Sequence, residues 1–122
     1  MRIYISGPIS ARPKPLDVVR EIFRSTADRL AMLGHTPVNP FDVPPHHGCA
    51  CPTEDQAGAG SGHAWGCYLR GDLAAMLDCD AILMLDGWEP SHGARLELAV
   101  ASACGLRVLM NLPEPAQGGV TG

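Results

Sequence analysis

The residue of this chain best suited to do chemistry is Glu97, a carboxylate on the apolar face of a predicted helix. The helix is expected to begin after Ser91, a good N-cap residue, and to run to Cys104. The other positions on this face recur at spacings of three and four and are small or apolar: Gly93, Ala94, Val100, Ala101 and Cys104. Because removing a carboxylate from water is costly, Glu97 must have a partner or line a cavity. The alternative to a reactive carboxylate is a salt-bridged structural glutamate.

A second carboxylate, Asp72, lies on another predicted helix, from about Trp65 to Leu77. The expected core side of this helix carries Leu69, Leu73, Met76 and Leu77. Tyr68 and Asp72 are one helical turn apart, so an aromatic ring and a carboxyl group can face the same cavity. A partly dry pocket formed by Trp65 and Tyr68 would raise the pKa of Asp72, which suits an acid that protonates a leaving group. The alternative is a solvated helix carboxylate.

Strands and helices alternate along the sequence. Predicted strands cover residues 2–6, 36–38, 81–85 and 107–110, and apolar positions at helical spacing predict a further helix from Pro15 to a stop at Gly34. This alternation predicts an α/β fold: a single domain with a doubly wound (Rossmann/flavodoxin-like) parallel sheet and helices on both faces. The domain is expected to span residues 1–112, followed by a flexible tail over residues 113–122.

In doubly wound sheets, ligands bind beyond the carboxyl ends of the strands, where the strand order reverses. This rule gathers two loops and one helix end into a predicted substrate site: Ser6, Gly7, Pro8, Ile9 and Ser10; Asp86, Trp88, Ser91, His92 and Gly93; Trp65 and Tyr68. The amides of residues 91–93 and the Ser91 hydroxyl would suit a phosphate at a helix N-terminus. Neither a Gly-x-Gly-x-x-Gly fingerprint nor a Gly-Lys-Ser/Thr sequence is present, which excludes the common dinucleotide and Walker-type loops.

Residues 42–63 form a predicted long loop rich in His, Cys and Pro. Loops of this length are usually functional lids or partly disordered. The candidate zinc ligands are His46, His47, Cys49 and Cys51, with His63 and Cys67 as possible additions. The Cys-x-x-Cys spacing of zinc knuckles is absent, and adjacent ligands strain a tetrahedral site. The pattern therefore favours a lid over a structural zinc, and we expect no cofactor.

Composition and charge exclude several classes of protein. The 122 residues carry a formal net charge of -4 without a block of Lys or Arg, which argues against binding a nucleic acid polymer. No apolar run approaches membrane-spanning length, and the sequence starts directly into a strand rather than a signal peptide. We therefore expect a cytoplasmic protein without a membrane partner. The five cysteines are an odd number, and Cys79 and Cys104 lie in or beside apolar segments, so free thiols are expected.

Three motifs occur in the predicted site, in the order Ile3-Tyr4-Ile5-Ser6-Gly7-Pro8, Tyr68-Leu-Arg-Gly-Asp72-Leu and Ser91-His-Gly-Ala-Arg-Leu-Glu97-Leu-Ala. Their order and spacing resemble the nucleoside 2-deoxyribosyltransferase family, including its 2'-deoxynucleoside 5'-monophosphate N-glycosidase branch, from residue 1 to about residue 110. The resemblance implies that Glu97 is the nucleophile, Tyr4 the tyrosine near it and Asp72 the carboxylate at the base. Ser91 lies where the transferases tend to have an aspartate and the monophosphate hydrolases a serine, which favours a phosphorylated substrate. The loop over residues 42–63 departs from both branches.

The resemblance and the residue types together predict cleavage of the N-glycosidic bond of a (deoxy)nucleoside 5'-monophosphate. The Glu97 carboxylate would capture the anomeric carbon as a glycosyl ester, and water would then hydrolyse the ester after the free base has left. If a second base attacked instead, the protein would be a deoxyribosyltransferase. Two other classes stay open: a non-catalytic nucleotide sensor and a zinc-stabilised interaction module built on residues 42–67.

The sequence also favours a homodimer or a larger homo-oligomer. A chain this short has little material to roof a nucleotide-sized pocket, and the resemblance implies a site shared between subunits. Trp65 and Trp88 supply aromatic surface of the kind enriched at interfaces, although either can line the pocket instead. Two-fold pairing is the commonest arrangement of soluble homo-oligomers, so a dimer is the first expectation.

Overall fold

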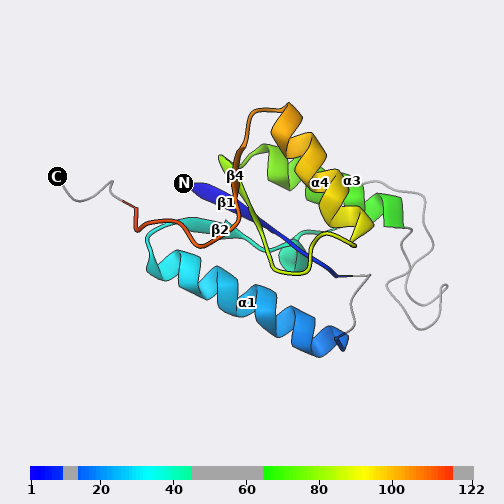
Figure 1. Cartoon of the computed structure of the whole chain (residues 1–122), viewed down its shortest axis with the longest axis horizontal. Helices are drawn as coiled ribbons and strands as arrows, with labels where there is room; N and C mark the ends of the chain where they lie inside the picture. The colour runs from blue at the N-terminus through cyan, green and yellow to red at the C-terminus, as the bar shows by residue number, and fades with distance from the viewer. Residues whose placement is uncertain (10–13, 45–64, 117–122) are drawn as a thin grey trace.

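A computed structural model describes residues 1–9, 14–44 and 65–116 of the chain (Figure 1). The elements are β1 (Arg2–Ser6), α1 (Leu16–Met32), β2 (Thr36–Val38), η1 (Pro40–Asp42), α3 (Trp65–Leu77), β3 (Ala81–Met84), α4 (His92–Ala103) and β4 (Arg107–Leu109). The predicted strands and helices are all present with similar bounds. The short 3-10 helix η1 was not predicted; the Asn39 side chain begins it by accepting a hydrogen bond from the Phe41 amide, at 3.0 Å.

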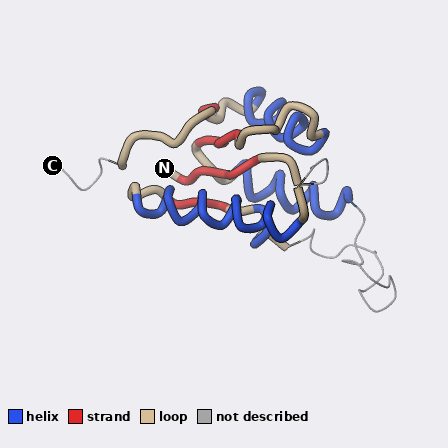
Figure 2. The backbone as a smooth tube through the Cα atoms, turned by 60° about the horizontal axis from the view of Figure 1, so that its bottom comes forward, coloured by secondary structure: helices blue, strands red, loops and turns tan. Residues whose placement is uncertain are grey.

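The strands form one parallel sheet in the order β2-β1-β3-β4, so β1 and β3 are the central pair. Helix α1 lies on one face, and α3 and α4 lie on the other (Figures 1 and 2). The chain passes from β1 to β2 on one side and later returns to β3 on the other side of β1. The strand order therefore reverses between β1 and β3, which confirms the doubly wound α/β fold. Sheets of this kind bind their ligands beyond the strands at such a reversal.

Each face of the sheet has its own hydrophobic core. On the α1 face the buried residues are Ile3, Ile5, Val19, Phe23, Leu30, Ala81 and Leu83. On the α3 and α4 face they are Tyr4, Met76, Cys79, Ile82, Met84, Ala94 and Ala101. Successive side chains of a strand point to opposite faces, so the unbroken apolar run of β3 supplies both cores at once.

Several helix residues that the sequence predicts to be buried are exposed. Leu16 is 37% exposed and Leu77 is 47% exposed, because they occupy the first and last positions of α1 and α3, where the helices receive less cover from the sheet. Ile22 is 38% exposed, and Cys104, expected on the buried face of α4, is exposed just after that helix ends. Within the described segments, no helix is both long and apolar enough to cross a membrane.

Residues 113–116, expected to begin a flexible tail, are tied to the end of α1 and the loop after it. The His35 ring Nε2 donates a hydrogen bond to the Glu114 carbonyl at 2.8 Å, and the Ala116 amide donates to the Leu33 carbonyl at 2.7 Å. Residues 113–116 make these hydrogen bonds through their backbone groups, which every residue type carries. The composition of this segment therefore could not predict that it is bound to the rest of the fold. Residues 117–122 lie outside the described part.

Candidate active site

Glu97 lies on the buried face of α4 and is hydrogen-bonded through both carboxylate oxygens. The Tyr4 hydroxyl donates to Oε2 at 2.8 Å, and the Ser6 hydroxyl donates to Oε1 at 2.6 Å. Glu97 is only 7% exposed to solvent. Among the described residues, the ion pairs join Arg24 to Glu21 and to Asp28, and neither involves Glu97. Within this part of the structure, Glu97 is therefore not a salt-bridged structural glutamate. Its partners are two neutral hydroxyl groups.

Strand and helix periodicity together bring these three side chains into contact. Tyr4 and Ser6 are two residues apart on β1 and therefore point to the same face of the sheet, toward α4. On α4 the buried positions are Ala94, Glu97 and Ala101, at helical spacing. The two alanines fill little space, so the helix can pack close enough to the sheet for the Glu97 side chain to reach β1.

Burial and hydrogen bonding act in opposite directions on the acidity of this cluster. Burial raises the pKa of Glu97 above its ordinary value, while the hydrogen bonds from Ser6 and Tyr4 lower it. The pKa of Tyr4 is raised strongly, first by burial and then by the negative charges of Glu97 and Asp72. Tyr4 therefore keeps its proton and acts as a permanent hydrogen-bond donor to Glu97.

Asp72 on α3 is the second acid of the cluster. Burial, and after it the negative charge of Glu97, raises the pKa of Asp72 from 3.8 to about 7. The interpretation of Asp72 as an ordinary solvated carboxylate does not agree with this environment. A carboxyl group that is partly protonated near neutral pH can give a proton to a departing group.

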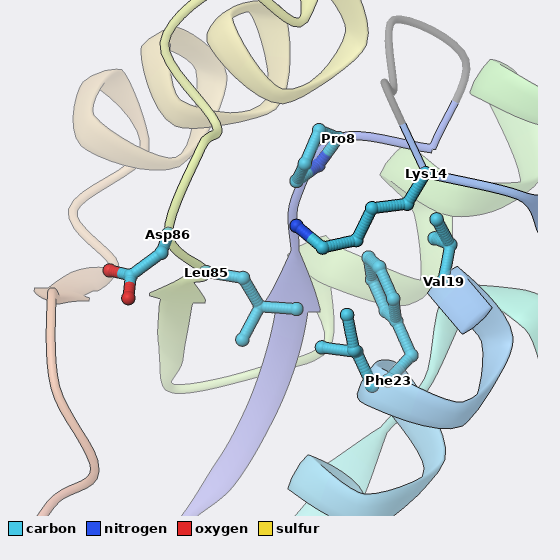
Figure 3. A pocket seen from close by; sticks show the side chains of 7 residues that line it. Pro8, Lys14, Val19, Phe23, Leu85 and Asp86 are labelled. Carbon is cyan, nitrogen blue, oxygen red and sulfur yellow. The ribbon is translucent and has the colours of Figure 1, made fainter.

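A small hollow, partly open to solvent, lies at the reversal of the strand order (Figure 3). It brings together Pro8 after β1 and Asp86 after β3, as predicted for substrate-binding loops. The remaining lining residues are Lys14, Val19, Ile22, Phe23 and Leu85. The Lys14 side chain extends over the hollow, and the Asp86 carboxylate points away from it (Figure 3). Lys14 lies near the end of the connection between β1 and α1, and the sequence did not predict it because its place over the hollow depends on tertiary contacts.

The hollow and Glu97 lie on opposite faces of the sheet at its carboxyl edge. Leu85 and Phe23 belong to the α1 side, and Gly7 packs against both: a Cβ atom on Gly7 would lie 3.0 Å from Leu85 and 3.2 Å from Phe23. A larger residue at position 7 would therefore push these two side chains of the α1 core aside. Its predicted contact with a substrate remains a prediction.

The N-terminus of α4 is capped as predicted. The Ser91 hydroxyl oxygen accepts a hydrogen bond from the Ala94 amide at 3.2 Å, and the Ser91 amide donates to the Trp88 carbonyl at 2.9 Å. The Ser91 amide is therefore not available to a phosphate, whereas the hydroxyl proton is not used by the cap. Trp88 is half-buried against the α3 and α4 core, His92 is exposed and Gly93 is half-buried.

Several other predicted site residues are placed only in part. Ile9 and Tyr68 are half-buried. Ser10, the candidate metal ligands His46, His47, Cys49 and Cys51, and His63 lie outside the described residues, as does the side chain of Trp65. Among the residues that the structure does describe, no group of three or more His, Cys, Asp or Glu side chains is placed to hold a metal ion.

A family model described as "Domain of unknown function (DUF4406)" matches residues 1–110. The match runs from β1 through the end of β4 and includes Tyr4, Ser6, Asp72 and Glu97. No curated protein matches the chain.

The raised pKa of Asp72 predicts a pH-dependent stability effect. A carboxyl group whose pKa is higher in the folded than in the unfolded state destabilises the fold increasingly as pH rises from 3.8 toward 7. We expect Asp72→Asn to raise the melting temperature at pH 8 by about 3–6 °C, or roughly 1 kcal/mol after allowance for the partial exposure of Asp72. The gain should largely vanish at pH 4, and the exposed Asp42→Asn should change the melting temperature little at either pH. Equal gains at pH 4 and pH 8 would contradict the shifted pKa.

Proposed function

This chain belongs to the DUF4406 family, a nucleoside 2-deoxyribosyltransferase-like family, and we propose that it hydrolyses the N-glycosidic bond of a (deoxy)nucleoside 5'-monophosphate. The observation that carries the proposal is a buried Glu97 carboxylate that is bound by two hydroxyls and whose negative charge, together with burial, raises the pKa of Asp72 to about 7. Such a pair supplies a nucleophile and a proton donor to one substrate.

In the first step, one Glu97 oxygen attacks the anomeric carbon C1' of the sugar, and the bond from C1' to the base nitrogen breaks. The bonding electrons leave with the base. Asp72, protonated below a pH of about 7, gives its proton to the base, so the base departs neutral. The positive charge that develops on the sugar lies next to the Glu97 carboxylate in a site of low polarity, where the attraction is strong.

In the second step, water attacks C1' of the glycosyl ester. The water proton passes to the Asp72 carboxylate, and the Glu97 carboxylate is released, so both residues return to their starting states. A second base that reached C1' before water would turn the same cycle into base exchange. Transferase activity is therefore the alternative form of the proposal, and it differs only in which acceptor enters the site.

A non-catalytic nucleotide sensor explains the arrangement less well. Binding a nucleotide does not require a desolvated carboxylate beside a second acid, and such a pair is costly to keep in a fold. A sensor would also gain nothing from an acid with a pKa near neutrality. The cost of the pair is understandable if it performs chemistry.

The proposal predicts that Glu97→Gln releases base at least about a thousandfold more slowly than the natural protein. The amide has nearly the same shape but no nucleophilic charge. Free base is measured by chromatography after incubation with a panel of 2'-deoxynucleoside 5'-monophosphates and the matching nucleosides. The exposed Glu114→Gln is the matched control and should retain full activity. Absence of base release by the natural protein across the panel would refute the proposed reaction.

The finer proposal of a phosphorylated substrate predicts a selective effect of Ser91→Asp. Aspartate caps a helix as well as serine does, and its charge repels a phosphate group. Because Ser91 is only 2% exposed, a melting curve of the variant first establishes that it is folded. We expect KM for a 5'-monophosphate to rise roughly tenfold or more, with KM for the corresponding nucleoside changed by less than about twofold. Equal changes for the two substrates would remove Ser91 from the phosphate site.

A further inference from the structure

The sheet holds Ser6 more firmly than is expected for a residue of a substrate-binding loop. It is the last residue of β1 and pairs in register with Met84 of β3. Its carbonyl accepts a hydrogen bond from the Leu85 amide at 2.8 Å, and the residue is 1% exposed. The backbone of Ser6 is therefore fixed by the central strand pair. Its side chain, on the face of Tyr4, is directed toward α4 and Glu97.

The two donors to Glu97 come from one rigid strand. A carboxylate with a single donor can still rotate about its terminal torsion, which is a soft degree of freedom. Ser6 and Tyr4 bind the two different oxygens from positions two residues apart on β1, and this removes the rotation. Ser6 stands at the carboxyl end of the strand, where ligands enter a doubly wound sheet, and Tyr4 lies one pair of residues deeper. The oxygen held by Ser6 is thus the one on the ligand side.

The ionised state of Glu97 depends on these donors. Burial disfavours the charged form of Glu97, and Asp72 on α3 is a second acid that interacts electrostatically with it. Tyr4 from β1 remains protonated and helps the charge. Within the described residues, the ion pairs lie elsewhere and involve Arg24. The stabilisation of the carboxylate must then come largely from hydroxyl donors, and the Ser6 contact at 2.6 Å is the shorter of the two.

We propose that Ser6 is a positioning residue for the reaction, which keeps Glu97 ionised and holds its ligand-side oxygen in place for attack on the sugar. The inference rests on the proposed function for its catalytic meaning. Its physical content, a Ser6 hydroxyl that governs the ionisation of Glu97, is independent of any activity.

The kinetic test is a graded series at position 6. The acidic limb of the pH profile of kcat/KM reports ionisation of the free enzyme's essential base. We expect this limb to move to higher pH by about one unit in Ser6→Ala, which lacks the donor, and by less in Ser6→Cys, whose thiol is a weaker donor of similar size. Ser25→Ala removes a hydroxyl from exposed α1 and should leave the limb in place. A purely structural role would lower the melting temperature without moving the limb.

A direct titration separates this inference from the proposed function. The chain has five glutamates, so carbon-13 labelling of their carboxyl groups gives few signals, and Glu97→Gln identifies the one from Glu97. The Glu97 signal should titrate at higher pH in Ser6→Ala than in the natural protein. If it does so in a protein that releases no base, the role of Ser6 stands and the proposed reaction fails. An unchanged Glu97 titration in a folded Ser6→Ala or, if that variant does not fold, in Ser6→Cys overturns the inference.

Discussion

The structure depends on how a single carboxylate is accommodated in an apolar interior. Glu97 has lost nearly all of its contact with water, and the groups that replace water are the hydroxyls of Tyr4 and Ser6. This requirement explains why two hydroxyl-bearing residues share one face of a central strand whose other buried residues, Ile3 and Ile5, are apolar. It also explains the small residues Ala94 and Ala101, which let α4 approach the sheet, and the raised pKa of Asp72 beside the same charge.

The two faces of the sheet differ in the kind of residue that they bury. The α1 face is purely apolar in its buried core, from Ile3 and Ile5 to Phe23 and Leu30, and stabilises the fold through packing. The opposite face carries the buried acid and its donors, which reduce stability unless they are fully hydrogen-bonded. Both faces meet beyond the reversal between β1 and β3, so a ligand bound there would have the buried acid on one side and the packed residues of the α1 core on the other. The hollow beside Lys14 marks this edge on the α1 side.

The sequence predicted most of the fold because the signals were local: buried strands, helical spacing and an N-cap each depend on neighbouring residues. Glu97 was also singled out by a local signal, since it is a charged residue on the apolar face of a predicted helix. The Ser6 contact was not predicted, since serine occurs commonly at strand ends, yet the two-residue spacing from Tyr4 could have revealed it. Lys14 and the 113–116 segment were missed because their positions depend on tertiary contacts, and η1 because it is shorter than any periodic pattern.

The central claim is that Glu97 forms a covalent bond to the sugar, and intact-protein mass spectrometry tests it most directly. A deoxynucleotide with fluorine at C2' destabilises positive charge at C1' and slows the cycle, so a glycosyl ester can accumulate. We expect a mass increase equal to one fluorinated sugar phosphate less one water molecule, located in the tryptic peptide of residues 96–107 and missing in Glu97→Gln. Release of base with the adduct on another residue, or with no adduct under conditions that slow turnover, would contradict it.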